Sequence, residues 1–208
     1  MNVTPASKLT RVMAPSDEEL VERFQSGEAS AFDVLVHRWE RKVQGAIYRL
    51  VGPGEDVRDL TQETLLKAYR GLRTFKKEAR FSSWLYQIAL NACRDRMRRG
   101  RGKSYVSFDE LVETGETGGE AGPSALDLIE ARDLSRQVAA AVAALPEEQR
   151  EVVVLKEYQG LTFLEIAEAL DVPLSTVKTR LYRGLGQLRQ QLVRQGIRGG
   201  APVPAPTS

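Results

Sequence analysis

Some of the acidic side chains in this sequence have a spacing that suits catalysis. Asp56, Asp59 and Glu63 repeat at helical intervals, so their carboxylates would share one helix face. Paired carboxylates can bind magnesium, and a metal-dependent nuclease is therefore one interpretation. A nuclease site would need a second acidic cluster in a recognisable pocket, and the sequence does not indicate one. We therefore expect a protein that is not an enzyme, with no catalytic residues, no metal site and no cofactor.

A second group combines aromatic and basic side chains within Arg80–Gly100. The aromatic residues Phe81, Trp84 and Tyr86 come first, and a basic run follows, which consists of Arg94, Arg96, Arg98, Arg99, Arg101 and Lys103. One interpretation is a buried helix whose last turn is solvated. The other is a surface for unpaired nucleic acid, because a base stacked on an aromatic face gains about 1–3 kcal/mol. This segment alone leaves both open.

The third group lies in Gly160–Leu188, whose pattern predicts a helix–turn–helix. Thr162 and Glu165 form a capping box for a short helix, Asp171–Leu174 make the turn, and we expect Ser175 to cap a longer helix. Leucines and a valine of that helix share one face and point inward (Val177, Leu181, Leu185, Leu188 and Leu192). Opposite them lie Ser175, Thr176, Thr179 and Arg183, with Lys178, Arg180 and Tyr182 on the flanks. Such side chains suit the major groove of DNA, and the alternative is a solvated basic face.

The charge distribution is uneven, although the formal net charge of the 208 residues is only +2. The basic run is followed by Ser104–Ala131, which contains acids but no Lys or Arg, and the chain turns basic again near Lys178. This alternation of basic and acidic segments indicates separate modules that bind a polyanion and are joined by an acidic connection. Cys93 and His37 are each the only residue of their type, so an internal disulfide is excluded. The start of the chain lacks a signal peptide pattern, and we expect a soluble, cytoplasmic protein.

Capping residues and apolar spacing predict the helices that would position these three groups of side chains. Ser16 and Glu19 open a first helix, apolar residues from Phe32 to Leu50 predict a long second one, and a third runs from Glu55-Asp56 to Leu72. We expect Ser82 to cap a fourth helix that runs towards Arg99. Helical spacing resumes around Leu126, and Pro146 should start another helix.

The predicted fold is therefore all-α, with two small helical domains joined by a flexible acidic linker. We place the first domain at residues 16–100, the linker at 101–131, and the helix–turn–helix domain at 132–195. Residues 196–208 are expected to be a disordered tail.

These segments, in this order, resemble the extracytoplasmic-function (ECF) group of bacterial sigma factors in the sigma-70 family, which direct RNA polymerase to promoters. The resemblance covers Asp17–Gly100 and Leu134–Leu192. Asp56-x-x-Asp59-x-x-Gln62 is similar to the segment that grips the clamp helices of the polymerase largest subunit. The resemblance thus implies that Asp56, Asp59 and Gln62 bind polymerase, and that the acidic linker passes through polymerase channels.

The same resemblance implies roles in DNA binding. RFSSWLYQIALNACRDRMRR looks like the segment that opens and reads the downstream promoter element. Phe75 and Asn91 would line a pocket for a flipped base, Trp84 would support that surface, and Arg94, Arg96, Arg98 and Arg99 would hold phosphates. Ser175, Thr176, Lys178, Thr179, Arg180, Tyr182 and Arg183 fall on the helix that reads the upstream element.

The expected function is that of a transcription initiation factor, which binds core RNA polymerase and directs it to promoters. Its partners would be core polymerase, duplex promoter DNA and the melted non-template strand, with an anti-sigma protein as a further partner that the resemblance suggests. We expect no membrane insertion. The alternative is a helix–turn–helix regulator that binds only duplex DNA and is not a polymerase subunit; it leaves the acidic and the aromatic–arginine segments unexplained.

Overall fold

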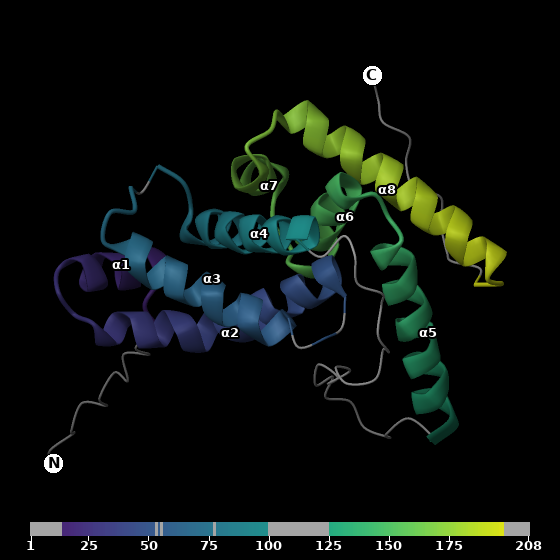
Figure 1. Cartoon of the computed structure of the whole chain (residues 1–208), viewed down its shortest axis with the longest axis horizontal. Coiled ribbons are helices and arrows are strands. Elements are labelled where there is room, and N and C mark those ends of the chain that lie inside the picture. Colours follow the sequence, from purple (N-terminus) through teal and green to yellow (C-terminus); the bar gives the residue numbers. More distant parts are fainter. Residues whose placement is uncertain (1–13, 53, 55, 77, 100–124, 198–208) are drawn as a thin grey trace, which may run out of the picture.

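The computed structural model describes residues 14–52, 54, 56–76, 78–99 and 125–197. Over these ranges the chain is built from helices joined by short turns and contains no strand, which confirms the all-α prediction (Figure 1). Within the same ranges, none of the helices combines the length and the apolar character needed to span a bilayer. The predicted tail lies almost entirely outside the described residues, as does most of the linker.

Four helices form the first unit: α1 (Asp17–Gln25), α2 (Ser30–Val51), α3 (Asp56–Leu72) and α4 (Phe81–Arg99). Ser16 and Glu19 make the predicted capping box, and the chain leaves α2 through Gly52, whose φ of 88° favours glycine. The apolar faces of the helices meet in one core that includes Leu35, Ile47 and Leu72. The prediction for Ser82 is wrong, because α4 begins at Phe81 and Ser82 lies within its first turn.

The second unit contains α5 (Ala125–Ala143), α6 (Glu147–Val153), a π-helical turn η1 (Val154–Tyr158), α7 (Phe163–Leu170) and α8 (Leu174–Arg194). Thr162 and Glu165 make the predicted capping box of α7. Pro146 is the N-cap of α6, one residue before its first helical residue. Helix α8 crosses α6 closely at Gly184, where an added Cβ would lie 3.0 Å from Cγ2 of Val153.

Two sequence predictions in this unit need correction. Helix α8 begins at Leu174 behind Pro173, so Ser175 is an exposed residue of its first turn and not its cap. Helix α5 begins at Ala125, so the last residues of the segment predicted as a flexible linker, 125–131, are helical; this agrees with the helical spacing noted from Leu126.

The two units pack against each other. Helix α4 lies alongside α7, and α2 contacts both η1 and α5, so that buried residues of both units form one continuous cluster (Figure 1). Tyr86 of α4 and Leu155 of η1 belong to it. This arrangement decides which faces of α4 remain accessible.

Candidate nucleic-acid and protein interfaces

The predicted polymerase residues lie on the outer side of α3. Asp59 and Gln62 are exposed, while Val57, Leu60 and Thr61 on the same helix are buried. Asp56 is half-buried, and its Oδ2 accepts a hydrogen bond from Nη2 of Arg96 on α4 at 2.6 Å. Contact with Asp56 raises the pKa of the Arg96 guanidinium. A protein partner that binds this side of α3 would therefore also meet the end of α4.

The acids considered for a nuclease do not converge. Oε1 of Glu63 pairs with Nζ of Lys67 at 2.6 Å, and Asp56 is engaged by Arg96. Throughout the described ranges, no three His, Cys, Asp or Glu side chains are placed to share a metal ion. Two of the α3 carboxylates thus form ion pairs, and the described residues do not form the cluster of metal-binding acids that the nuclease interpretation requires.

The aromatic residues of α4 divide between core and surface. Phe81 and Tyr86 are buried, with exposed fractions of 2% and 1%, and both pack edge-on against Trp39. Trp84 is only partly buried, and its ring lies 4.8 Å from that of Phe75, centroid to centroid. Burial in the core is therefore confirmed for Phe81 and Tyr86, whereas a surface for unpaired nucleic acid stays a prediction for the less buried residues. Trp84 and Phe75 remain as a partly exposed aromatic pair.

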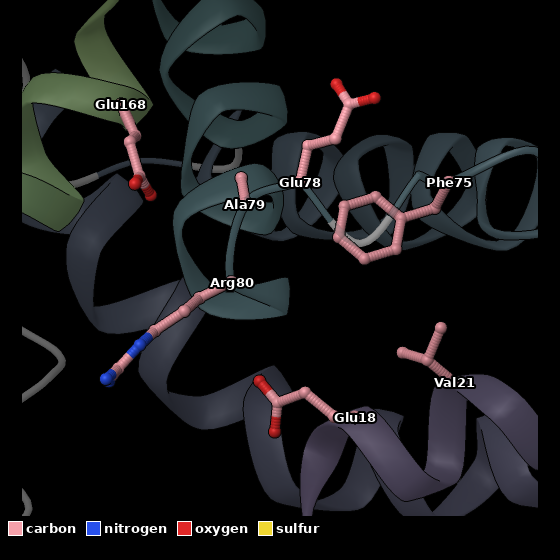
Figure 2. Close-up of a pocket in the computed structure, with 7 residues that line it drawn as sticks. All are labelled: Glu18, Val21, Phe75, Glu78, Ala79, Arg80 and Glu168. Atoms are coloured by element: carbon pink, nitrogen blue, oxygen red, sulfur yellow. The ribbon is translucent and has the colours of Figure 1, made fainter.

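Phe75 lies at the wall of a pocket between the α3–α4 loop, α1 and α7. The pocket has a volume of about 580 Å³ and is lined by Glu18, Val21, Phe75, Glu78, Ala79, Arg80 and Glu168 (Figure 2). Its carboxylates come from α1, the loop and α7. Asn91 does not line this pocket, so the structure does not bring it together with Phe75 there, although Asn91 is exposed on α4.

Gln25, which the sequence analysis missed, holds the loop that carries Phe75. Its Nε2 donates hydrogen bonds to the carbonyl oxygens of Leu72 and Phe75, both at 2.9 Å. A glutamine at the end of α1 gives no periodic signal, and its target lies about 50 residues further along the chain. Only the packing of α1 on the end of α3 identifies it as a positioning residue.

The arginines at the end of α4 differ in accessibility. Arg98 and Arg99 are exposed, and Arg98 pairs with Asp95 one turn away. Arg94 is tied to the second unit: its Nε and Nη2 donate to Oε1 and Oε2 of Glu151, each at 2.7 Å. Glu151 is 2% exposed. These hydrogen bonds, opposed by partial burial, raise the pKa of the Arg94 guanidinium.

Helix α8 presents the predicted DNA-reading residues on its outer face. Ser175, Lys178, Thr179 and Arg183 are exposed, and Thr176 and Tyr182 are half-buried. Val177, Leu181 and Leu188 are buried on the opposite face, and Leu185 and Leu192 pack against the core, as the spacing predicted. Nη2 of Arg180 pairs with Oε2 of Glu148 at 2.9 Å, which directs this arginine towards α6. The helix thus offers short polar and basic side chains to solvent at its start.

A helix–turn–helix and a separate helical unit with an aromatic and arginine surface define a class of protein that meets nucleic acid at two places. Two family models match the chain: Sigma-70 region 2 over residues 35–103, and Sigma-70, region 4 over residues 135–188. The chain therefore belongs to the sigma-70 family, as an RNA polymerase sigma factor of the ECF group. Relatives that carry the ECF name establish the group within the family. They also confirm the predicted resemblance and the predicted function.

Among similar proteins, the ECF RNA polymerase sigma-E factor of Escherichia coli K12 is 37% identical over 174 residues, which cover 81% of this chain and 90% of that protein. The RNA polymerase sigma-H factor of Pseudomonas aeruginosa PAO1 is 34% identical over 189 residues, covering 86% and 96%. Of solved structures, CnrH in complex with the cytosolic domain of CnrY has a TM-score of 0.64 at 27% identity, covering 86% and 99%. The sigma factor RpoE in complex with the anti-sigma factor NepR from Bartonella quintana shares the fold, with a TM-score of 0.60 at 20% identity, covering 78% and 96%.

Proposed function

We propose that the two units divide the work of transcription initiation. Residues 16–100 bind core RNA polymerase and hold the melted downstream promoter element, and residues 132–195 read the duplex upstream element. The segment between them follows a path through the polymerase. The protein has no active site of its own and works in the cytoplasm, where polymerase carries out the phosphoryl transfer.

The Phe75–Trp84 pair is the observation that carries this proposal. The two ring centroids lie 4.8 Å apart, with Phe75 on the loop held by Gln25 and Trp84 on α4, where the exposed Arg98 and Arg99 follow it. Aromatic faces favour bases that have left the stack, and arginines bind the phosphates between them. Extruding a base from the duplex costs a few kcal/mol. Capture of a few bases therefore offsets much of the free energy needed to open a short stretch of duplex. A regulator that binds only duplex DNA would have no use for such a pair.

Polymerase contact is assigned to Asp56, Asp59 and Gln62 on α3. Asp59 and Gln62 are exposed, and the nearby Leu66 exposes 49% of its surface. An apolar side chain beside acids and an amide suits a protein partner better than nucleic acid, whose phosphates the acids would repel. The CnrH structure contains the cytosolic domain of CnrY. This supports a second protein partner, besides polymerase, for the present chain as well.

Run-off transcription with bacterial core polymerase on a promoter library tests the proposal. Adding this protein should give discrete transcripts, and permanganate should modify thymines near their start sites. Replacing both Phe75 and Trp84 with alanine should abolish the permanganate signal while upstream duplex protection remains. Replacing Lys178 and Arg183 with alanine should remove the upstream protection instead, so the two variants serve as controls for each other. Thymines that stay protected with the unaltered protein would contradict strand capture.

A further inference from the structure

The Phe75 pocket carries an excess of negative charge. Its three carboxylates come from three elements: Glu18 from α1, Glu78 from the α3–α4 loop and Glu168 from α7 (Figure 2). All three residues are exposed, and within the described ranges none of their carboxylates takes part in an ion pair or a hydrogen bond. Carboxylates around one cavity repel one another, so a cation that entered the pocket would be attracted by all three.

Arg80 also lines the pocket, but its charge is balanced elsewhere. Its Nη1 pairs with Oε1 of Glu165 at 3.0 Å, and Figure 2 shows its side chain extending away from Phe75. Glu165 belongs to the capping box of α7, where its Oε2 accepts hydrogen bonds from the backbone and the hydroxyl of Thr162. The Arg80 guanidinium is therefore held at α7 and leaves the three pocket carboxylates without compensation.

The form of the pocket favours an organic cation over a metal ion. Throughout the described ranges, no three acidic, histidine or cysteine side chains are placed to share a metal ion. The volume of about 580 Å³ is instead that of a site for a larger group. The half-buried Phe75 and the buried Val21 add an aromatic and an apolar wall. A lysine or arginine side chain matches this lining, because its stem packs on apolar surface while its charge reaches carboxylates and an aromatic face.

The chain supplies such side chains directly ahead of α1. The described residues begin at Ala14, and Glu18 lies in the first turn of α1. The preceding residues 1–13, MNVTPASKLTRVM, contain Lys8 and Arg11 and no acidic residue. An extended chain spans about 3.3–3.6 Å per residue, so Lys8 lies within roughly 20 Å of Ala14, and Arg11 lies closer. Both side chains are therefore within reach of the pocket.

The point from which residues 1–13 depart is fixed on the first unit. Nη2 of Arg38 donates a hydrogen bond to the carbonyl oxygen of Pro15 at 2.8 Å, and Nε1 of Trp39 donates to Oδ2 of Asp17 at 3.0 Å. These contacts hold the start of α1 against α2. A short connection to a fixed point keeps a tethered group at a high effective concentration, so that even a weak site for it is occupied.

We propose that residues 1–13 are a basic arm that docks in the Phe75 pocket, with its lysine and arginine paired to the three pocket carboxylates. The docked arm balances the charge beside the Phe75–Trp84 pair, where the pocket alone would repel phosphates. The docking depends on the charges of the chain itself. It therefore holds whether or not Phe75 contacts DNA, and it is independent of the proposed function.

Limited digestion of the full chain with trypsin measures docking, because this protease cleaves after Lys8 and Arg11 when they are accessible. An isotope-labelled synthetic peptide of residues 1–16, digested in the same tube, gives the rate for an arm without a pocket. Cleavage after Arg11 should be about fivefold or more slower in the protein, since the rate follows the population of the undocked arm. At about 1 M salt, where the Debye length is about 3 Å, this protection should disappear.

Variants of the pocket test where the arm docks. Glu18→Gln combined with Glu168→Gln should raise cleavage after Arg11 to the rate of the peptide. Glu40→Gln combined with Glu157→Gln is the matched control, because it changes the net charge equally at two exposed residues that do not line the pocket. The control should keep the protection. Circular dichroism melting curves should be alike for both double variants, since all four side chains are exposed.

An exchange of charges tests the pairing itself. Arg11→Glu alone should accelerate cleavage after Lys8, because the carboxylates of the pocket repel the altered arm. The double variant Arg11→Glu with Glu18→Arg should restore slow cleavage after Lys8, because the opposite charges face each other again. Fast cleavage after Lys8 in the double variant would contradict a pairing between the arm and Glu18.

Three further results would overturn the inference. If Arg11 of the unaltered protein is cleaved as fast as in the peptide, the arm does not dock. If protection survives in the pocket variant, the arm docks elsewhere. If Arg11 is unprotected but agmatine raises the melting temperature of the unaltered protein and not of the pocket variant, the pocket takes a free organic cation instead. The digest contains neither polymerase nor DNA, so none of these results bears on the transcription test.

Discussion

The Asp56 carboxylate on α3 accepts a hydrogen bond from the Arg96 guanidinium on α4 at 2.6 Å. The contact joins the proposed polymerase surface to the proposed DNA surface. Both side chains are close to half exposed, so either can exchange its partner for an external one. Polymerase that engages Asp56 would therefore release Arg96 for a phosphate.

Asp56→Asn and Asp59→Asn should separate these two effects. Each should weaken core polymerase binding by roughly two- to tenfold, as expected for charges near the rim of an interface. Only Asp56→Asn should also tighten binding of single-stranded DNA by the free protein, because it releases Arg96. Fluorescence anisotropy with core polymerase and with a labelled oligonucleotide measures both. Alanine at both positions should spare duplex binding through α8, and equal loss of both activities would contradict the division of work.

Gln25→Ala should reduce capture of melted DNA without unfolding the protein. It removes two 2.9 Å hydrogen bonds that fix the loop ahead of Phe75, and the loop carbonyls can be hydrated instead. We expect several-fold weaker permanganate reactivity in the polymerase complex and a small change in melting temperature. Ser26→Ala is the matched control, because the Ser26 hydroxyl bonds within α1, to the Glu22 carbonyl. Equal loss in both variants would show that α1 stability, and not the loop, is responsible.

Gly184→Ala should destabilise the helix–turn–helix unit. The new methyl group would lie 3.0 Å from Cγ2 of Val153 and 3.4 Å from Cβ of Gln149, so these buried or half-buried neighbours on α6 must shift to admit it. Overpacking of this kind costs about 1–3 kcal/mol. Gly186→Ala, in the same helix, meets nothing within 4 Å and should stabilise it by about 0.5–1 kcal/mol. Urea denaturation monitored by circular dichroism distinguishes the two signs.

The Cys93 thiol should make stability fall at alkaline pH. Burial, followed by the charge of Glu151, raises the pKa of Cys93 from 9.0 to about 12. Between these values the unfolded thiol loses its proton while the folded one retains it, so the unfolded state binds fewer protons and the free energy of unfolding decreases as pH rises. The slope is at most about 1.4 kcal/mol per pH unit. Urea denaturation from pH 8 to pH 10 should show a decrease in the unaltered protein and a smaller decrease in Cys93→Ala; part of it remains because burial also raises the pKa of Tyr86.

Local sequence signals were sufficient for most of the fold. Capping boxes at Ser16 and Thr162 and apolar spacing along α2 and α8 act within a few residues, so each helix could be placed from its own segment. The errors lie at helix starts. Ser82 and Ser175 have the chemistry of caps, but burial of Phe81 brings it into the first turn of α4, and Pro173 takes the cap position of α8. Tertiary packing and proline geometry outweighed the cap preference.

For the candidate site, the sequence by itself determined which residue types share a helix face, and the order of its motifs carried the resemblance to the family. It could not determine which of Phe81, Trp84 and Tyr86 would be buried, because spacing defines a face but not what covers it. The engagement of Arg94 by Glu151 was likewise decided only by tertiary structure. That pair depends on two surfaces far apart in sequence meeting each other, and both the burial and the charge pairing exist only while they are in contact.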